Sequence, residues 1–555
     1  MLYDLKKYFV LFLILLLVCT GCSCSKSEKL KEGYICGNES LINLYNKEFE
    51  ETETIKRGSE VKILSKSKDG NEEYYKIKHN GKEYYVLASN ISKDKDNLVT
   101  EKEMFVRTSL TVYEEMDSPK ILGYLKKGSK VTIKGYDYLN DDGSVHKYKI
   151  KYDDKDGYIY GKYLLLDSDE ANKPYDEENS YQNFLKIENT LGGGNAYSLD
   201  YYPYPKANFK DNTMPDEVRA LYLNVSAVRN VEKYISFAKD NNINAFVVDI
   251  KDNTMPGYES PVMQNYSITN YENAASTFDE YKNYIKLLKD NGFYVIGRIT
   301  VFKDSFFVND HPETAIVSTS TGEPFNHNGS YWPSAYQRLV WEFNVSLAKE
   351  AATEMGFNEI QFDYVRFPDR TGSYEKNGSI SMKNTYDETK AEALQTFLMY
   401  AADELHEIGV YISADVFGEC AHNYVTAYGQ YWPAISNVVD VISGMPYPDH
   451  FNAYEYGFKQ VVWTVPYDLL SVWGEYAAKK QTMIPTPAKV RTWIQTYNTV
   501  KSPYVVYDAN KISEQISALY EQGLSDGYMT WNAGSSLTKY EEVKEAFKKE
   551  YKKWK

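Results

Sequence analysis

The sequence predicts a multidomain α/β protein: a C-terminal (β/α)8 TIM barrel over residues 216–555, preceded by two small all-β barrels. Two observations predict this fold class. A short strand-and-turn motif occurs twice before residue 167. From about residue 217, apolar runs of strand length alternate with amphipathic stretches, which is the pattern of a parallel sheet covered by helices.

Charge and composition limit the possible partners of the 555-residue chain. Its formal net charge is −15, whereas nucleic-acid binding needs a basic surface, so we expect no nucleic-acid partner. Aromatic residues make up 15% of the chain and 53 residues are Tyr. Tyr suits sugar binding, because its ring stacks on C–H groups while its hydroxyl forms hydrogen bonds. Tyr is also common in β-strands, and both explanations stay open.

The first element is an export signal at residues 1–22. Lys6 and Lys7 precede the apolar run Phe9–Val18, as in a secretory signal peptide. The run ends at Cys19-Thr20-Gly21-Cys22, which resembles the lipobox of bacterial lipoproteins, with Cys where Leu is usual. We therefore expect lipidation at Cys22 and an extracytoplasmic protein anchored to the cell membrane. An uncleaved anchor is the alternative, although the apolar run is short for a membrane span.

Cysteines do not predict a disulfide framework. Three of the five cysteines, Cys19, Cys22 and Cys24, lie in or directly after the leader, and only Cys36 and Cys420 follow, in different predicted domains. Beyond His422, nothing near Cys420 suggests a paired base, so a buried or idle thiol is expected there.

An internal repeat follows the leader. Residues 55–63 match residues 125–133, and Tyr75-Lys-Ile-Lys78 matches Tyr148-Lys-Ile-Lys151. Alternating strands between turn signals predict two all-β modules, at residues 30–95 and 101–167. The pattern resembles bacterial SH3-like domains, and this resemblance implies attachment to the cell wall. Two β-barrels without a ligand remain the alternative.

Residues 168–215 read as a linker, because they are acidic, then Gly-rich, then rich in Pro and Tyr. Within this stretch, residues 201–205 are expected to pack on the following domain.

Eight strand-length apolar runs make up the barrel. Ser226 is expected to cap the first helix, and the second helix carries apolar residues from Phe278 to Leu288 and ends at Gly292. A doubly wound sheet is the competing fold, but no Gly-rich phosphate loop follows the first strand. The expected strands are residues 220–225, 245–250, 294–302, 359–365, 410–416, 440–445, 492–497 and 527–532.

Acidic residues recur at the C-terminal ends of these strands, where barrels of this kind place their functional groups. Asp249, Asp363 and Asp415 lie within or at the end of apolar strands, where an unpaired carboxylate is costly. Two carboxyls on neighbouring strands suit glycoside hydrolysis: one protonates the leaving oxygen, and the other attacks the anomeric carbon or activates water. We therefore predict Asp363 and Asp415 as the catalytic pair.

Other polar and aromatic residues at the same strand ends are candidates for substrate binding. No metal-ligand spacing and no nucleophile-elbow motif occur, so we expect no metal and no cofactor. The candidates are Asp249, Lys251, Arg298, Asp304, Tyr364, Arg366, Tyr447, Trp531 and Asn532.

Several of these segments resemble the bacterial family called "putative glycoside hydrolase domain", a barrel related to the α-amylase clan, over roughly residues 200 to 550. The most specific segment is Phe362-Asp-Tyr-Val-Arg-Phe-Pro368, and the others are residues 249–251, 297–304, 413–418 and 445–448. The resemblance implies that Asp363 is the nucleophile and Asp415 the proton donor.

The chain departs from the clan at three places. The clan usually has Glu on the fifth strand, which leaves Glu419 as a rival to Asp415. Gln361 stands where the clan has Arg, and Arg298 or Arg366 could replace that Arg. Gln495 stands where the third acid is expected.

Together these features predict an exported lipoprotein glycoside hydrolase that acts on a cell-wall or extracellular polysaccharide. The alternative is a non-catalytic carbohydrate- or wall-binding protein with a degenerate barrel.

Overall fold

The computed structural model describes residues 32–173 and 193–553. The predicted signal peptide and Cys22 lie outside these residues. By its contacts the chain divides into two compact units. The smaller comprises the described part of Met1–Met104, with Val131–Lys151 and Tyr160–Leu166. The larger comprises Phe105–Lys130, Tyr152–Ile159 and the described residues from Asp167 onward.

Two antiparallel sheets precede the barrel, and their strand orders agree with the internal repeat. The orders are β3-β2-β6-β5-β4-β1-β7 and β10-β9-β13-β12-β11-β8-β14, which are the same order with each number raised by seven. The first sheet contains β1 (Glu32–Ile35), β2 (Leu41–Tyr45), β3 (Glu51–Lys56), β4 (Glu60–Asp69), β5 (Glu72–His79), β6 (Lys82–Leu87) and β7 (Ile91–Ser92). The second contains β8 (Glu103–Val106), β9 (Leu110–Tyr113), β10 (Ile121–Leu125), β11 (Lys130–Tyr136), β12 (Lys147–Tyr152), β13 (Lys155–Tyr160) and β14 (Leu164–Leu165).

Alternation along the strands builds the core of the first sheet. Ile42 and Leu44 on β2 are buried, whereas the alternate residues Leu41 and Asn43 are exposed. Ile77 and Val86 join them in one cluster. The predicted SH3-like identity of the two modules stays a prediction.

The predicted barrel is confirmed as a parallel sheet of nine strands, in the order β23-β22-β21-β19-β17-β16-β15-β25-β24. Every neighbouring pair that is hydrogen-bonded is parallel. Because β23 and β24 are separated only by Arg491, they fill one position between β22 and β25 and bring the barrel to eight positions. The strands are β15 (Val218–Leu223), β16 (Ala245–Lys251), β17 (Tyr294–Thr300), β19 (Glu359–Asp363), β21 (Tyr411–Phe417), β22 (Val441–Met445), β23 (Lys489–Val490), β24 (Thr492–Gln495) and β25 (Gly527–Trp531).

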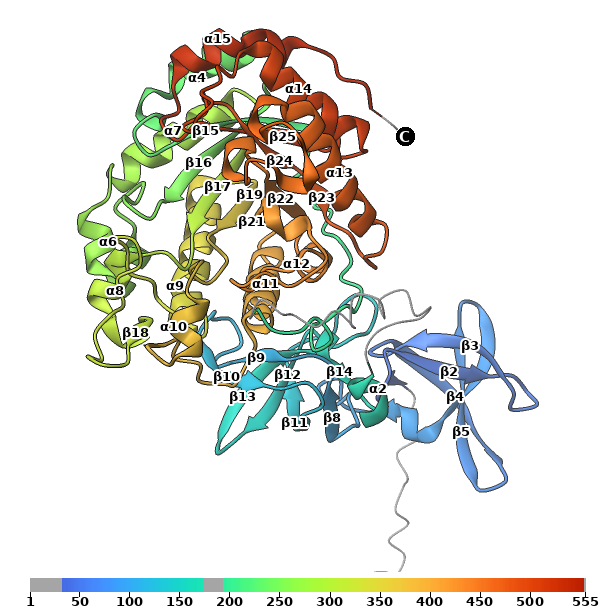
Figure 1. Ribbon diagram of the computed structural model, residues 1–555. Coiled ribbons are helices and arrows are strands. Elements are labelled where there is room, and N and C mark those ends of the chain that lie inside the picture. The colour runs from blue at the N-terminus through green and yellow to red at the C-terminus, as the bar shows by residue number, and fades with distance from the viewer. Residues whose placement is uncertain (1–31, 174–192, 554–555) are drawn as a thin grey trace, which may run out of the picture. The chain divides into compact units, whose positions relative to one another are not determined.

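Helices surround these strands (Figure 1). In the described ranges, no helix is both long and apolar enough to cross a membrane. The principal helices are α4 (Val231–Asp240), α7 (Phe278–Asp290), α9 (Arg338–Glu350), α11 (Lys390–His406), α12 (Trp432–Val438), α13 (Pro466–Gln481), α14 (Ala509–Glu521) and α15 (Leu537–Lys548).

The sequence predicted the C-terminal end of the second barrel helix correctly and the N-terminal end of the first one incorrectly. Helix α7 ends at Asp290 with Gly292 in the left-handed region at φ 82°, as predicted. The prediction that Ser226 caps the first helix is wrong. The side chain of Asn224 instead accepts hydrogen bonds from the backbone N–H groups of Ser226 and Ala227, and α4 begins only at Val231.

Two segments outside the barrel pack against it within the larger unit. In the predicted linker, Tyr201 and Tyr204 are buried, and Arg107 pairs with Asp200 at 3.0 Å. The β9–β10 segment contacts α11, where the Tyr400 hydroxyl donates to the Pro119 carbonyl at 2.5 Å. The linker also contains the short helix α2 (Ser168–Asn172). Residues 174–192 of the linker lie outside the described ranges.

Candidate active site

A cavity of about 470 Å³ opens at the C-terminal ends of the barrel strands. Every one of the eight barrel positions contributes a side chain from a strand or from the residues just after it. In strand order these are Tyr222, Asp249, Arg298, Asp363, Asp415, Tyr447, Trp493 and Trp531.

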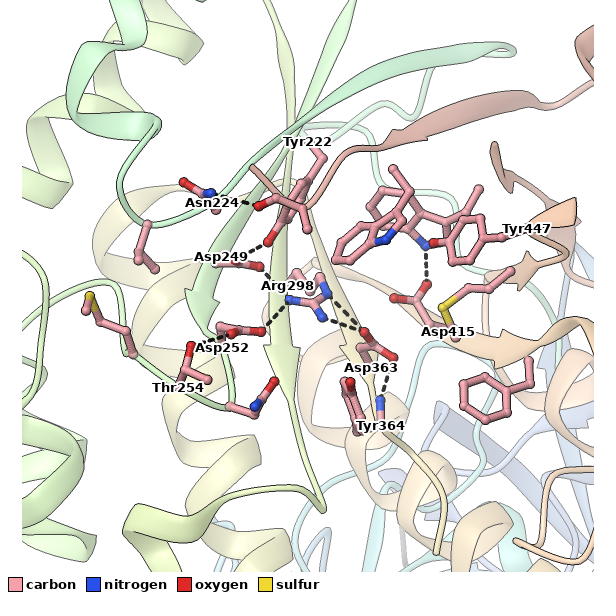
Figure 2. A pocket seen from close by; sticks show the side chains of 18 of the residues that line it. Tyr222, Asn224, Asp249, Asp252, Thr254, Arg298, Asp363, Tyr364, Asp415 and Tyr447 are labelled. Atoms are coloured by element: carbon pink, nitrogen blue, oxygen red, sulfur yellow. Dashed lines mark hydrogen bonds and ion pairs between the residues drawn. The ribbon is translucent and has the colours of Figure 1, made fainter. Parts of the chain in front are cut away.

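Arg298 holds the acidic residues of one wall together (Figure 2). It is 2% exposed, and its guanidinium reaches Asp249 at 2.7 Å, Asp252 at 3.3 Å and Asp363 at 2.6 Å. Charge-assisted hydrogen bonds of this kind fix both distance and orientation. Of the two arginines that could replace the Arg of the clan, Arg298 and Arg366, Arg298 is the one that pairs with Asp363.

Asp363 accepts hydrogen bonds on both carboxyl oxygens. Both Nε and Nη2 of Arg298 donate to its Oδ2, at 3.1 and 2.6 Å, and the backbone N–H of Tyr364 donates to Oδ1 at 2.6 Å. Tyr364 adopts φ 52°, a left-handed conformation that is uncommon for an aromatic residue. Such strain often lies beside functional groups, and here it directly follows the end of β19.

Asp415 has the opposite environment. It is 1% exposed, and its Oδ1 accepts a hydrogen bond from Nε1 of Trp493 at 2.8 Å. Its Oδ2 is buried with no hydrogen-bond partner among the described residues. Burial, with the Asp363 carboxylate nearby, raises the pKa of Asp415 well above its usual range. Asp415 therefore holds a proton under conditions in which ordinary carboxyls are ionised.

The other two carboxyls of the Arg298 wall are those of Asp249 and Asp252. The Tyr222 hydroxyl donates to Asp249 at 2.5 Å. Burial raises the pKa of Asp249 to about 6, although the charge of Arg298 opposes the rise. Burial acts in the same direction on Asp252, but Arg298 and a hydrogen bond from Thr254 outweigh it and lower the Asp252 pKa.

Aromatic rings close the cavity on the Asp415 side. The rings of Tyr447 and Trp531 are nearly parallel, with centroids 6.1 Å apart, and the Trp493 ring is edge-on to Trp531. Burial, and then the nearby carboxyls of Asp415 and Asp363, raises the pKa of Tyr447. Its hydroxyl therefore remains a hydrogen-bond donor facing the acidic pair.

The structure does not bring four of the predicted substrate-binding residues into the lining. Lys251 and Asp304 form a buried ion pair with each other at 2.6 Å, and Asp304 also caps a helix through the Phe307 N–H. Arg366 is buried, with its guanidinium 4.4 Å from the Phe417 ring centroid. Asn532 donates to the Thr496 carbonyl. These side chains hold the surrounding loops in place.

Glu419, the rival proton donor, lies outside this cavity, and both its oxygens accept hydrogen bonds from Tyr424 and Tyr428. Gln361 is fully buried below the site and donates to Ser443. Gln495 accepts a hydrogen bond from the backbone of Asp449.

The sequence did not point to three of the site residues described above, Tyr222, Asp252 and Trp493. Asp252 directly follows β16, so the polar run after Asp249 was a usable signal. Trp493 lies two residues before Gln495 on β24, and period-two alternation places both on one face.

Comparison with known proteins gives the family. Residues 220–537 match the family model described as "Putative glycosyl hydrolase domain". The chain belongs to this family. A search of curated proteins found no match.

Several solved structures are similar to parts of the chain. A hypothetical protein from Ruminiclostridium thermocellum ATCC 27405 is 34% identical, with 35% of this chain and 97% of that chain covered and a TM-score of 0.30. The PgaB (BpsB) glycoside hydrolase domain from Bordetella bronchiseptica is 14% identical, with 60% and 98% covered and a TM-score of 0.44. A class V chitinase from Pseudomonas fluorescens Pf-5 is 13% identical, with 60% and 100% covered and a TM-score of 0.39.

Proposed function

We propose that the protein hydrolyses glycosidic bonds in a polysaccharide, with Asp415 as proton donor and Asp363 as the carboxylate at the anomeric carbon. One observation carries the proposal: two carboxyls on adjacent strands have opposite environments, one paired with an arginine and one buried with a free oxygen. Glycoside hydrolysis needs such a division, because one carboxyl must be protonated while the other is charged.

The strand register supports the pairing. Gln361 is opposite Ser413 and Phe362 is opposite Ala414 on the parallel strands β19 and β21. Continuing this register places Asp363 opposite Asp415, on strands about 4.8 Å apart. A glycosidic oxygen held between them would receive the proton from Oδ2 of Asp415.

The charge of the cavity also suits this chemistry. When Asp415 is protonated, three carboxylates remain in the cavity, those of Asp249, Asp252 and Asp363. They surround the guanidinium of Arg298, which is the only one among the described lining residues. The transition state of glycoside hydrolysis carries positive charge on the sugar ring. Fixed carboxylates around that ring stabilise the charge without reorganising during the reaction.

Release of reducing ends from a panel of wall and capsule polysaccharides tests the proposal. Asp415→Asn should lower turnover by about 10²- to 10⁴-fold, the usual contribution of general acid catalysis. Asp363→Asn should be impaired at least as strongly. The control is Asp387→Asn, whose side chain is 99% exposed and should leave turnover unchanged. Binding without turnover in the unaltered protein would instead support the non-catalytic alternative.

We also propose that the protein is lipid-anchored outside the cell and held at the wall by its two N-terminal modules. The signal-like leader ending at Cys22 and the repeated motif support this proposal. Metabolic labelling with palmitate should mark the protein, and Cys22→Ser should abolish the label. Deleting residues 30–95 should weaken sedimentation of the protein with insoluble cell walls, and unchanged sedimentation would contradict wall attachment.

A further inference from the structure

A second cavity of about 530 Å³ adjoins the first, and the two share Phe417, Met445 and His450 in their linings. Its walls come from the residues after β21, from the loop after β22 and from Val500 and Lys501 after β24. Both volumes are within the range of small-molecule sites. The shared residues make the two cavities one continuous cleft.

Asp415 lines the first cavity and lies two residues before Phe417, which lines both. The next residue, Gly418, lines the second cavity, whereas Arg298 and Asp363 line only the first and lie together on one side of Asp415 (Figure 2). A proton donor reaches the oxygen between two sugars, and the attacking carboxylate lies at the sugar that keeps the anomeric carbon. This order assigns the first cavity to that sugar and the second to the leaving group.

We propose that the second cavity is the leaving-group subsite, and that it takes a sugar without an acidic group. The inference rests on the proposed function. It adds where the polysaccharide extends beyond the cleaved bond and which sugars are excluded there.

A pair of parallel rings provides the binding surface. His422 and Tyr424 stack with centroids 5.5 Å apart and an interplanar angle of 5°, and both are half-buried in the cavity wall. The Tyr424 hydroxyl is fixed by donating to Glu419 at 3.1 Å. A fixed aromatic face is the surface on which the C–H groups of a sugar ring pack.

The charge of the second cavity excludes acidic sugars. Three carboxylates line it, those of Glu419, Asp449 and Glu455, against the single ammonium of Lys501. That ammonium donates to the Phe451 carbonyl and lies 4.9 Å from the Trp463 ring centroid. Burial lowers the pKa of both His422 and His450, so their imidazoles add no positive charge near neutral pH. A sugar carboxylate or phosphate would meet repulsion there.

The test compares a probe that fills only the first cavity with probes that fill both. The short probes are glycosyl fluorides of glucose and of N-acetylglucosamine, whose fluoride leaving group is too small to fill the second cavity. The long probes are β-1,4-linked hexasaccharides of the same two sugars. We expect Tyr424→Ala to raise KM for a cleaved hexasaccharide about tenfold, a size consistent with the loss of one ring contact, and to change kinetics on the glycosyl fluoride much less. Tyr424→Phe keeps the ring and should restore most of the hexasaccharide KM.

Two further arms complete the test. Tyr197→Ala removes a 62% exposed ring that lines neither cavity, and it should match the unaltered protein on every probe. The glucose hexasaccharide and its 6-carboxylated counterpart have the same linkage, so weaker cleavage and weaker binding of the carboxylated chain would support the exclusion of acidic sugars. Binding is measured by calorimetry with Asp363→Asn, which also reports on chains that are bound without being cleaved.

The outcomes separate the two proposals. Turnover with equal effects of Tyr424→Ala on short and long probes, or preferred cleavage of the carboxylated chain, would overturn the subsite and leave the proposed function standing. Neither binding nor turnover of any probe would overturn both.

Discussion

Arg298 carries the only guanidinium among the described residues that line the first cavity, and three carboxylates share it. Asp415 does not contact it, and the free Oδ2 of Asp415 is the one carboxyl oxygen of the catalytic pair without a partner. The difference between the two acids therefore arises from a single arginine placed on one side of the cleft.

The protonation of Asp415 predicts the alkaline side of the pH profile. Because burial and Asp363 raise its pKa, kcat/KM should stay high through the range in which ordinary carboxyls ionise and fall as pH rises through that raised pKa. Trp493→Phe removes the N–H that stabilises the charged form, so the alkaline limb should move about one unit higher. The measurement is kcat/KM against pH for both proteins, and a limb that moves to lower pH would contradict the assignment.

Asp415 should also weaken the fold as pH rises. Below the unfolded-state pKa, both states hold the proton and the group has no effect on stability. Above it the unfolded chain releases a proton that the folded chain retains, so folding loses stability until pH exceeds the folded pKa. Asp415→Asn cannot ionise and still accepts from Trp493. Its Tm advantage over the unaltered protein should therefore be larger at pH 7 than at pH 4, and the reverse trend would refute the raised pKa.

The sequence alone could predict the acidic residues on strands but not their neighbours in loops. Asp249, Asp363 and Asp415 were accessible because strands alternate and barrel sites lie at strand ends. Lys251 and Asp304 also satisfied these criteria, yet they pair with each other in the interior. Alternation cannot tell a side chain that lines a cavity from one that neutralises a charge behind it.

At the scale of elements, the seventh barrel position shows a buried ion pair in place of a continuous strand. The predicted strand 492–497 is instead β23 and β24 with Arg491 between them. Arg491 is fully buried and donates to both oxygens of Glu359 on β19, at 2.8 and 3.0 Å. The Tyr294 hydroxyl on β17 donates to the same carboxylate at 3.0 Å. The interruption of the strand therefore coincides with a contact that links three barrel strands.

Removing one partner of this pair should destabilise the barrel strongly. Arg491→Met leaves Glu359 charged and buried, which costs about 3–5 kcal/mol in comparable cases. Urea unfolding measures the loss. The double variant Arg491→Met with Glu359→Gln removes both charges, and it should recover part of the loss. Strictly additive destabilisation would show that the pair is not coupled.

At the scale of the whole chain, the second predicted module also has contacts with the barrel. Its strands, within the predicted residues 101–167, form one sheet, and residues 105–130 and 152–159 of this module group with the barrel by their contacts. Residue patterns report strands and turns, whereas this grouping depends on which surfaces meet. On β9, Tyr113 is 1% exposed and packs 5.8 Å from the ring centroid of Tyr400 on α11.

This grouping predicts how truncations behave. A chain that begins at residue 216 keeps the predicted barrel but loses Tyr113, Tyr124 and the buried Tyr201. The Tyr400 ring then loses its contact with Tyr113, and the Arg338 guanidinium loses its contact with the Tyr124 ring. Burying a large apolar side chain contributes about 1.5–3 kcal/mol, so losing two or more of them should cost about 3–6 kcal/mol. A chain that begins at residue 101 keeps these contacts and should unfold at clearly higher urea concentration. Equal midpoints for the two truncated chains would show that the barrel from residue 216 is stable without these segments.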